Sequence, residues 1–375
     1  MKAWTYSRAG LPTKTLKLVE VPVPSLPTPT SVLVKVSHVS LHPGTSIMAQ
    51  IIPFLFRKSP AVAETDFSGT IVAVGEKAEG ARRLSVGSSV FGTIAVPSHL
   101  STGAGALGEY VAVESATVAL TPDGVLPEAA CGFGVSAPTA LALVDAALLK
   151  PGARVIVNSP CGGVGHFATQ LARRAVGPEG RVVGICSEAN ESFARELGCD
   201  EVVAYDRVPG GISVPQYLGQ RYGLSSEFGG FDAVIDAYGS QPLWLDSPKY
   251  LKPGNECPYA TVGTKAPVKV SFSAMAWSLW GMISNSLWPV WLGGIPRRYS
   301  MISMFVDEKT MERVRKEAEA GAFNVHVGGR WKFEDAKQVR YGQYDSRLDC
   351  RNPSTNQSMI PRRTWSCSMG MHEGN

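Results

Sequence analysis

The chain has 375 residues, enough for two domains, and its 44% hydrophobic and 18% charged residues exclude a disordered or fibrous protein. Its formal net charge of +4 is small for this length, and no basic stripe with interleaved aromatic residues occurs, so we expect no nucleic-acid partner. The seven cysteines form no CxxC pair, and the first ten residues contain no apolar segment of the secretory type. Both features favour a reducing, cytoplasmic location.

The first 125 residues are predicted to form short β-strands separated by glycine and proline. Helical periodicity is weak there, which is typical of a small, partly barrel-like β domain. An alanine-rich helical segment begins at Pro127, so we place the domain boundary near residue 125. The predicted strands are 16–21, 31–39, 67–74, 89–94 and 109–113.

Residues 155–173 predict a buried strand, a glycine turn and an amphipathic helix in direct succession. The first glycine of the usual dinucleotide pattern is missing, because Pro160 holds its place, so the surrounding elements must support the assignment. A strand at 181–186, a helix at 191–197 and a strand at 201–204 follow. This order predicts a doubly wound parallel sheet with a nucleotide site at the turn.

Two further buried strands are predicted at 231–235 and 259–263. The first is followed by Asp236, at the carboxyl end of the strand, where open α/β sheets bind their ligands. We therefore include Asp236 among the candidate binding residues.

Residues 275–292 contain four tryptophans and no charge. Three interpretations stay open: a buried or interfacial helix, a peripheral attachment to a membrane or other lipid surface, and a true membrane span. After residue 336 the sequence becomes polar and loses its periodicity, so we expect 337–375 to be an atypical, disordered or loosely packed tail without the usual final strand.

Several motifs in this order resemble the medium-chain dehydrogenase/reductase superfamily, within it the zinc-independent quinone oxidoreductase and alkenal reductase group. The resemblance implies a GroES-like β-rich domain over 1–125, to which residues 300–336 return, and a Rossmann domain over 126–299. It also implies an active site between the two domains. The motifs are DFSGTIVAVG at 66–75, VGSSVFG at 86–92, GALGEYVAV at 105–113, GGVG at 162–165, LKPG at 251–254 and FEDA at 333–336.

The same resemblance argues against a catalytic metal. Zinc-dependent members carry an early cysteine and a Gly-His-Glu triplet, whereas this chain reads Ala63-Glu64-Thr65 at that place and has no cysteine before Cys131. We therefore expect no zinc. The implied reaction is hydride transfer to an activated double bond or a quinone ring.

The predicted cofactor is NADPH, with NADH less favoured. An NAD site usually ends its second strand in an acidic residue, but this strand ends in Ser187, with Asn190 nearby. Glu188 would favour NAD if its side chain turned into the pocket, and Thr139 could instead be an ordinary helix-start residue. The predicted cofactor contacts, taken from the sequence pattern and the resemblance, are Thr139, Gly162, Gly163, Val164, Gly165, Ser187, Asn190, Tyr205, Asp236, Val262 and Gly263.

The candidate catalytic residues are His42 and Thr45. His42 and Pro43 stand where relatives typically have Asn-Pro, and an imidazole there suits proton donation to a developing enolate. The alternative is a partly buried histidine that only hydrogen-bonds the backbone.

Three functions are compatible with these sequence features. The first is an NADPH-dependent, zinc-independent reductase of a small-molecule quinone or α,β-unsaturated carbonyl, acting as a monomer or homodimer. The second is a trans-acting enoyl reductase of a polyketide or fatty-acid pathway. The third is a catalytically inactive, NADPH-binding, membrane-associated protein.

Overall fold

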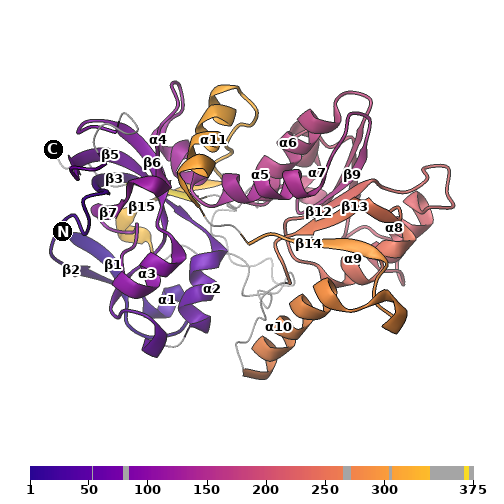
Figure 1. Cartoon of the computed structure of the whole chain (residues 1–375), viewed down its shortest axis with the longest axis horizontal. Coiled ribbons are helices and arrows are strands. Elements are labelled where there is room, and N and C mark those ends of the chain that lie inside the picture. Colours follow the sequence, from indigo (N-terminus) through magenta and orange to yellow (C-terminus); the bar gives the residue numbers. More distant parts are fainter. Residues whose placement is uncertain (53, 79–83, 265–271, 304–305, 338–366, 371–375) are drawn as a thin grey trace, which may run out of the picture. The chain divides into compact units, whose positions relative to one another are not determined.

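A computed structural model describes the chain except residues 53, 79–83, 265–271, 304–305, 338–366 and 371–375. The chain forms a β-rich unit and a parallel-sheet unit, which confirms the predicted fold class (Figure 1). The β-rich unit comprises Met1–Val135, Phe305–Gly321 and Val325–Asn375, and the parallel-sheet unit comprises Ser136–Met304 and Ala322–Asn324.

A seven-stranded sheet forms the larger part of the β-rich unit, in the order β15-β16-β3-β5-β6-β8, with β7 paired to β3. Buried valines alternate with more exposed residues along the first part of β3, as a strand with one covered face requires. The strands are β3 (Ser31–Leu41), β5 (Asp66–Val74), β6 (Ser89–Thr93), β7 (Tyr110–Glu114), β8 (Val118–Leu120), β15 (Gly329–Lys332) and β16 (Cys367–Gly370).

A smaller antiparallel sheet in the order β2-β1-β4 and several short helices complete this unit. The strands are β1 (Lys2–Tyr6), β2 (Lys17–Glu20) and β4 (Ala61–Val62). The helices are α1 (Pro12–Thr15), α2 (Pro43–Ile51), α3 (Val96–Thr102), α4 (Pro127–Ala130) and α11 (Glu308–Glu319).

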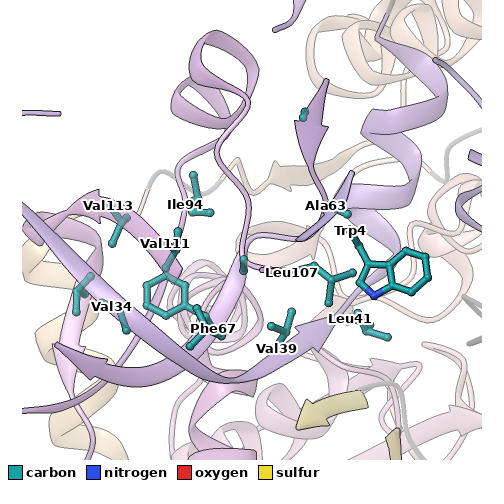
Figure 2. Packing of buried hydrophobic residues seen from close by; sticks show 14 of the residues in the cluster. Trp4, Val34, Val39, Leu41, Ala63, Phe67, Ile94, Leu107, Val111 and Val113 are labelled. Atoms are coloured by element: carbon teal, nitrogen blue, oxygen red, sulfur yellow. The ribbon is translucent and has the colours of Figure 1, made fainter. Parts of the chain in front are cut away.

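The hydrophobic core of the β-rich unit joins residues from both ends of its sequence. Phe67 is fully buried and lies among side chains that include Val34 and Val111 (Figure 2). The indole Nε1 of Trp4 donates a hydrogen bond to the Phe333 carbonyl oxygen at 2.8 Å. The late segment of the chain is therefore part of the same core as the first strand.

The structure differs from the sequence expectation at two places. The predicted boundary near residue 125 falls within the β-rich unit, because α4 packs on this unit and the Ser68 hydroxyl donates to the Pro127 carbonyl oxygen at 2.6 Å. The tail supplies a strand after all, since β16 pairs parallel with β15 and antiparallel with β3. The disorder expected for the rest of the tail concerns 338–366 and 371–375, which lie outside the described residues.

The parallel-sheet unit has six parallel strands in the order β11-β10-β9-β12-β13-β14. Numbered from its own first strand, this is the order 3-2-1-4-5-6. Successive strands are added toward one edge of the sheet from β9 and toward the other edge from β12, so a ligand crevice is expected between the carboxyl ends of these two strands. The strands are β9 (Arg154–Asn158), β10 (Arg181–Cys186), β11 (Glu201–Ala204), β12 (Ala233–Asp236), β13 (Gly254–Thr261) and β14 (Arg297–Met301).

Helices cover both faces of this sheet, with α5 and α6 on one side and α8 and α9 on the other (Figure 1). Tyr250, Tyr259 and Phe231 are among the fully buried side chains of its core. The helices are α5 (Ser136–Ala146), α6 (Gly165–Val176), α7 (Glu191–Glu196), α8 (Val214–Tyr222), α9 (Gln241–Leu245) and α10 (Phe272–Leu287).

The tryptophan-rich segment 275–292 contains most of α10 and the short helix Val290–Leu292. Several side chains in its second half are exposed in the single chain, with Leu287 at 74% and Trp291 at 81%, so of the first interpretation only an interfacial helix remains for these residues. Among the described residues, no single helix is long and apolar enough to cross a membrane. The bent pair of Pro127–Phe133 and Ser136–Ala146 passes the same length and composition test.

His99 makes the stability of the β-rich unit sensitive to pH. Its side chain is 2% exposed, and Nδ1 donates to the Ala104 carbonyl oxygen at 2.7 Å, so Nε2 accepts from the Tyr6 hydroxyl at 2.8 Å. Burial lowers the pKa of His99 below its ordinary value of 6.5. The folded state therefore binds a proton less readily than the unfolded state.

We predict that this unit loses stability as the pH falls from 6.5 through the lowered pKa of folded His99, because only the unfolded state gains the proton in that range. His99→Gln should reduce this dependence, measured as the urea midpoint of unfolding against pH. The control is the exposed His326→Gln, which should leave the dependence unchanged. Identical pH profiles for wild type and His99→Gln would contradict the prediction.

Candidate functional site

A glycine turn joins β9 to α6 at the carboxyl end of the parallel sheet. Ser159 takes a φ of +63°, and the Gly162 amide donates to the Ser159 carbonyl oxygen at 3.1 Å. Gly165 begins α6, and a Cβ at this position would lie 1.8 Å from that same oxygen. Only glycine therefore allows the helix to begin so close to the strand.

The beginning of α6 has the properties of an anion-binding site. The helix is 12 residues long, so its peptide dipoles give the first turn a partial positive charge. The first amide groups of a helix have no acceptor within that helix and can bind phosphate oxygens. The structure places Gly162, Gly163, Val164 and Gly165 in this one turn; their contact with a pyrophosphate remains a prediction.

Three of the predicted residues lie together where β10 and β11 end. Cys186 is in register with Ala204, so Ser187 and Tyr205 follow on neighbouring strands. The Asn190 amide Nδ2 donates to Ser187 Oγ at 3.1 Å. Tyr205 is 57% exposed and therefore accessible to a ligand at this edge.

Arg207 is a residue that the sequence analysis missed. It forms an ion pair with Glu188, and both side chains are exposed. Glu188 was the one residue expected to favour NAD, and this cation neutralises its carboxylate. The sequence signal that could have identified Arg207 is its position, three residues after the end of β11.

Asp236 has extensive hydrogen bonding within the unit. Its carboxylate is 1% exposed and accepts five hydrogen bonds. It thereby joins β9, the turn after β12, and β13. The donors are Asn158 Nδ2 at 2.7 Å, the amides of Tyr238 at 3.1 Å, Gly239 at 2.9 Å and Ser240 at 2.6 Å, and the Tyr259 hydroxyl at 2.8 Å.

The remaining predicted contacts of this unit lie near the same sheet end. The Val262 amide donates to the Asp236 carbonyl oxygen at 3.2 Å, and Gly263 follows with a φ of +98°. Thr139 is 9% exposed, on helix α5, which contacts β13. Contact of these residues with a nicotinamide ring stays a prediction.

His42 lies in the β-rich unit beside a buried carboxylate. Its Nε2 is 3.1 Å from Thr65 Oγ1 and 3.8 Å from Asp66 Oδ1. The Thr65 hydroxyl donates to Asp66 Oδ1, so it must accept from His42, and Nε2 carries a proton. Asp66 is 1% exposed and also accepts from the Thr93 hydroxyl at 2.6 Å and the Val135 amide at 2.8 Å.

Thr45 lies beside His42 but is turned toward a second buried carboxylate. Its hydroxyl is 3.0 Å from the His42 carbonyl oxygen and 2.6 Å from Glu64 Oε2. Glu64 is 2% exposed and takes a φ of +59°. Sequence reasoning used residues 63–65 only to argue against zinc and did not anticipate that Glu64 and Asp66 would lie beside the two candidates.

Two family models match the chain. The one described as alcohol dehydrogenase GroES-like domain matches residues 28–123, and the one described as zinc-binding dehydrogenase matches residues 163–303.

Curated proteins are similar over most of the chain. The medium chain reductase pydE of Acremonium sp is 32% identical in an alignment of 304 residues that covers 76% of this chain and 78% of pydE. This chain belongs to the medium-chain dehydrogenase/reductase superfamily. The trans-enoyl reductase poxH of Penicillium oxalicum is 29% identical and covers 90% of this chain and 93% of its own. A chloroplast envelope quinone oxidoreductase homolog of Arabidopsis thaliana is 35% identical, covering 68% and 73%.

Solved structures of medium-chain enzymes share the fold. The mycobacterial protein Rv1454c, determined in complex with NADPH, superposes with a TM-score of 0.71 at 19% identity and covers 99% of both chains. Membership of the superfamily and the relatives' activities make this chain an oxidoreductase.

The residues around His42 do not match a zinc site of the superfamily. Among the described residues, no group of three or more His, Cys, Asp or Glu side chains is arranged to hold a metal ion. Near His42, the Glu64 and Asp66 carboxylates already accept hydrogen bonds from hydroxyl and amide groups. Activity without zinc remains a prediction for this oxidoreductase.

We predict that Asp236→Asn lowers the free energy of unfolding of the parallel-sheet unit by about 2–4 kcal/mol, because an amide nitrogen would replace an oxygen that faces buried donors. The measurement is equilibrium unfolding in urea. Asp206→Asn is the matched control, at an exposed position two residues after the end of β11 in the same sheet, and it should cost at most about 1 kcal/mol. If the two variants lost the same free energy of unfolding, the five hydrogen bonds to Asp236 would not stabilise this unit as predicted.

Proposed function

We propose that this medium-chain reductase uses NADPH to reduce the activated double bond of an α,β-unsaturated carbonyl compound or a quinone. The observation that carries the proposal is the end of β10, where Ser187 and Asn190 form a neutral hydrogen-bonded pair and Arg207 neutralises Glu188. Hydroxyl, amide and guanidinium groups suit a 2′-phosphate, which an acidic residue at Ser187 would repel.

The glycine turn fits the rest of such a cofactor. The position at Gly165 has no room for a Cβ, and the first turn of α6 is electropositive. Gly162, Gly163 and Val164 would hold the pyrophosphate, with Thr139, Val262 and Gly263 beside the nicotinamide. When bound, NADPH supplies the hydride for the reduction.

His42 is the proposed proton donor. The reduced substrate must gain a proton at the carbon or oxygen that receives negative charge, and an imidazole is suited to this transfer at neutral pH. The buried Asp66 carboxylate lies 3.8 Å from Nε2 and accepts from the Thr65 hydroxyl, which in turn accepts from Nε2, so this chain fixes the orientation of the ring. Thr45 contributes by holding the Glu64 carboxylate at 2.6 Å and by contacting the His42 backbone.

A second candidate is a trans-acting enoyl reductase, whose substrate is an enoyl thioester attached to a carrier protein. The similarity to the trans-enoyl reductase poxH over 90% of this chain favours it. The chemistry at the double bond is the same, so the two candidates differ only in whether a free small molecule is accepted.

The test of the cofactor is a fluorescence titration with NADPH and NADH. We predict at least about tenfold tighter binding of NADPH, and Ser187→Asp should remove most of that preference because a carboxylate repels the 2′-phosphate. Ser192→Asp adds the same charge at an exposed position of α7 and is the matched control. Equal affinities of the wild-type protein for both cofactors would contradict the proposal.

The test of the reaction follows NADPH consumption with quinones, enals and carrier-bound enoyl thioesters. Turnover of free enones or quinones supports the first candidate, and turnover of carrier-bound substrates alone supports the second. Tight NADPH binding with no turnover in any group would instead support an inactive NADPH-binding protein.

We predict that His42→Gln lowers kcat by about a hundredfold or more while the Kd of NADPH stays unchanged, because proton donation contributes to the chemical step and not to cofactor binding. His38→Gln is the control, since this partly buried histidine lies on the same strand end. An unchanged kcat in His42→Gln would place the proton donor elsewhere.

A further inference from the structure

The exposed tryptophan-rich segment has no place in the proposed reaction. Helix α10 lies at the periphery of the parallel-sheet unit, and the short helix Val290–Leu292 follows it (Figure 1). Residues 280–296 contain no charged side chain. An exposed apolar surface of this kind usually marks a site of attachment. We call its exposed members the tryptophan surface: Trp280, Ile283, Leu287, Trp288, Trp291 and Leu292.

Helix α10 turns an apolar face outward and a polar residue inward. Trp280, Ile283 and Leu287 are spaced by three and four residues, so they share one face, and all three are exposed in the single chain. Asn285 lies on the opposite face, where its side-chain amide exchanges two hydrogen bonds with that of Gln241, at 2.8 and 2.9 Å. A helix at a water surface has the reverse arrangement. The outward face of α10 is therefore suited to an apolar environment.

Aromatic side chains join the helix and the segment after it into one surface. The rings of Trp280 and Trp288 meet edge to face, with their centroids 6.1 Å apart. Trp288 Nε1 donates to the Leu292 carbonyl oxygen at 3.0 Å, which holds the short helix close to the end of α10. Tryptophan is typical of the boundary between lipid and water, because its large apolar ring carries one polar N–H group.

The charges that border the tryptophan surface along the chain are positive. Arg298 is exposed, and Arg297 is fixed in place because its Nε donates to the Leu251 carbonyl oxygen at 2.7 Å. No aspartate or glutamate occurs between Glu256 and Asp307. Apolar side chains bordered by basic ones match the headgroup region of an anionic bilayer, where the rings enter the acyl boundary and the guanidinium groups meet phosphate or carboxylate.

We propose that the tryptophan surface attaches this oxidoreductase peripherally to an anionic lipid membrane. Helix α10 lies in the plane of the interface, with its outward face among the upper acyl chains and Arg298 at the level of the headgroups. The helix does not span the bilayer, because its 16 residues are too few and Asn285 on its other face is bonded to Gln241 of α9. The attachment depends on neither the cofactor nor the reaction.

A second copy of the chain is the less favoured occupant of this surface. In a twofold contact the same surface meets itself, so the basic residues of one copy would face those of the other. Residues 257–306 contain no acidic side chain that could compensate this charge. An anionic headgroup supplies the missing negative charge.

The test is flotation of the full-length protein, without cofactor, on vesicles of phosphatidylcholine alone or with about 30% phosphatidylserine. We expect the protein to float with the anionic vesicles and to bind the neutral ones at least about tenfold more weakly. Binding to the anionic vesicles should weaken as the salt concentration rises, because salt screens the attraction.

Variants test the surface itself. Leu287→Ala should weaken binding to the anionic vesicles by about fivefold or more, and Trp291→Ala by about tenfold or more, because less apolar area enters the bilayer. Leu148→Ala, at an exposed position after α5 of the same unit, is the matched control and should leave binding unchanged. Arg298→Gln should reduce the difference between the two kinds of vesicle. Circular dichroism checks that each variant keeps the native fold.

The proposal has clear contrary outcomes. No flotation with either vesicle, equal binding to both, or equal effects of Leu287→Ala and Leu148→Ala would overturn it. A lipid-free dimer in analytical ultracentrifugation that Leu287→Glu dissociates would also overturn it, because the tryptophan surface would then be an interface between copies. NADPH binding and turnover are measured separately, so failure of the proposed function and failure of the membrane attachment are distinguishable.

Discussion

The close approach of Gly165 to the carbonyl oxygen of Ser159 is the constraint on which the proposed nucleotide site depends. A Cβ would stand 1.8 Å from that oxygen, so the helix can begin there only on glycine. This contact directs the first turn of α6 toward the carboxyl end of the sheet and leaves little freedom to the residues between.

The polar groups at the carboxyl end of the parallel sheet are fixed by hydrogen bonds to one another, independently of any ligand. Asp236 satisfies five donors from three segments, and Asn190 is bonded to Ser187. The Asp236 network keeps its geometry in a low-dielectric surrounding, because breaking any of its hydrogen bonds leaves a buried donor unpaired. A site built in this way needs little rearrangement to receive a cofactor.

The order of elements in the parallel-sheet unit was predictable because it depends on local signals. Apolar strands such as 155–157, the glycines of the turn and the helical periodicity after them act over a few residues. The site in the β-rich unit was less accessible to sequence reasoning. His42, Glu64 and Asp66 meet only because β3 pairs with β5, and a pairing between distant segments leaves no periodic signal in either.

The Arg207–Glu188 ion pair and the strand in the tail were not predicted either. Both depend on contacts between separate segments of the chain, which leave no local sequence pattern. Arg207 forms an ion pair with Glu188 across the ends of neighbouring strands, whereas the sequence showed only that Glu188 would favour NAD if its side chain turned into the pocket. The tail lacks periodicity, yet four of its residues pair with β3 and β15, where backbone hydrogen bonds make little demand on side-chain pattern.

The interleaving of the two units has a consequence for how the chain acquires its structure. The parallel-sheet unit is nearly continuous, from Ser136 to Met304, whereas the β-rich unit needs segments from both sides of it. Trp4 cannot reach its partner Phe333 until the whole intervening stretch has been synthesised. During translation the second unit can therefore fold first, and the strands nearest the N-terminus must wait with apolar surface exposed.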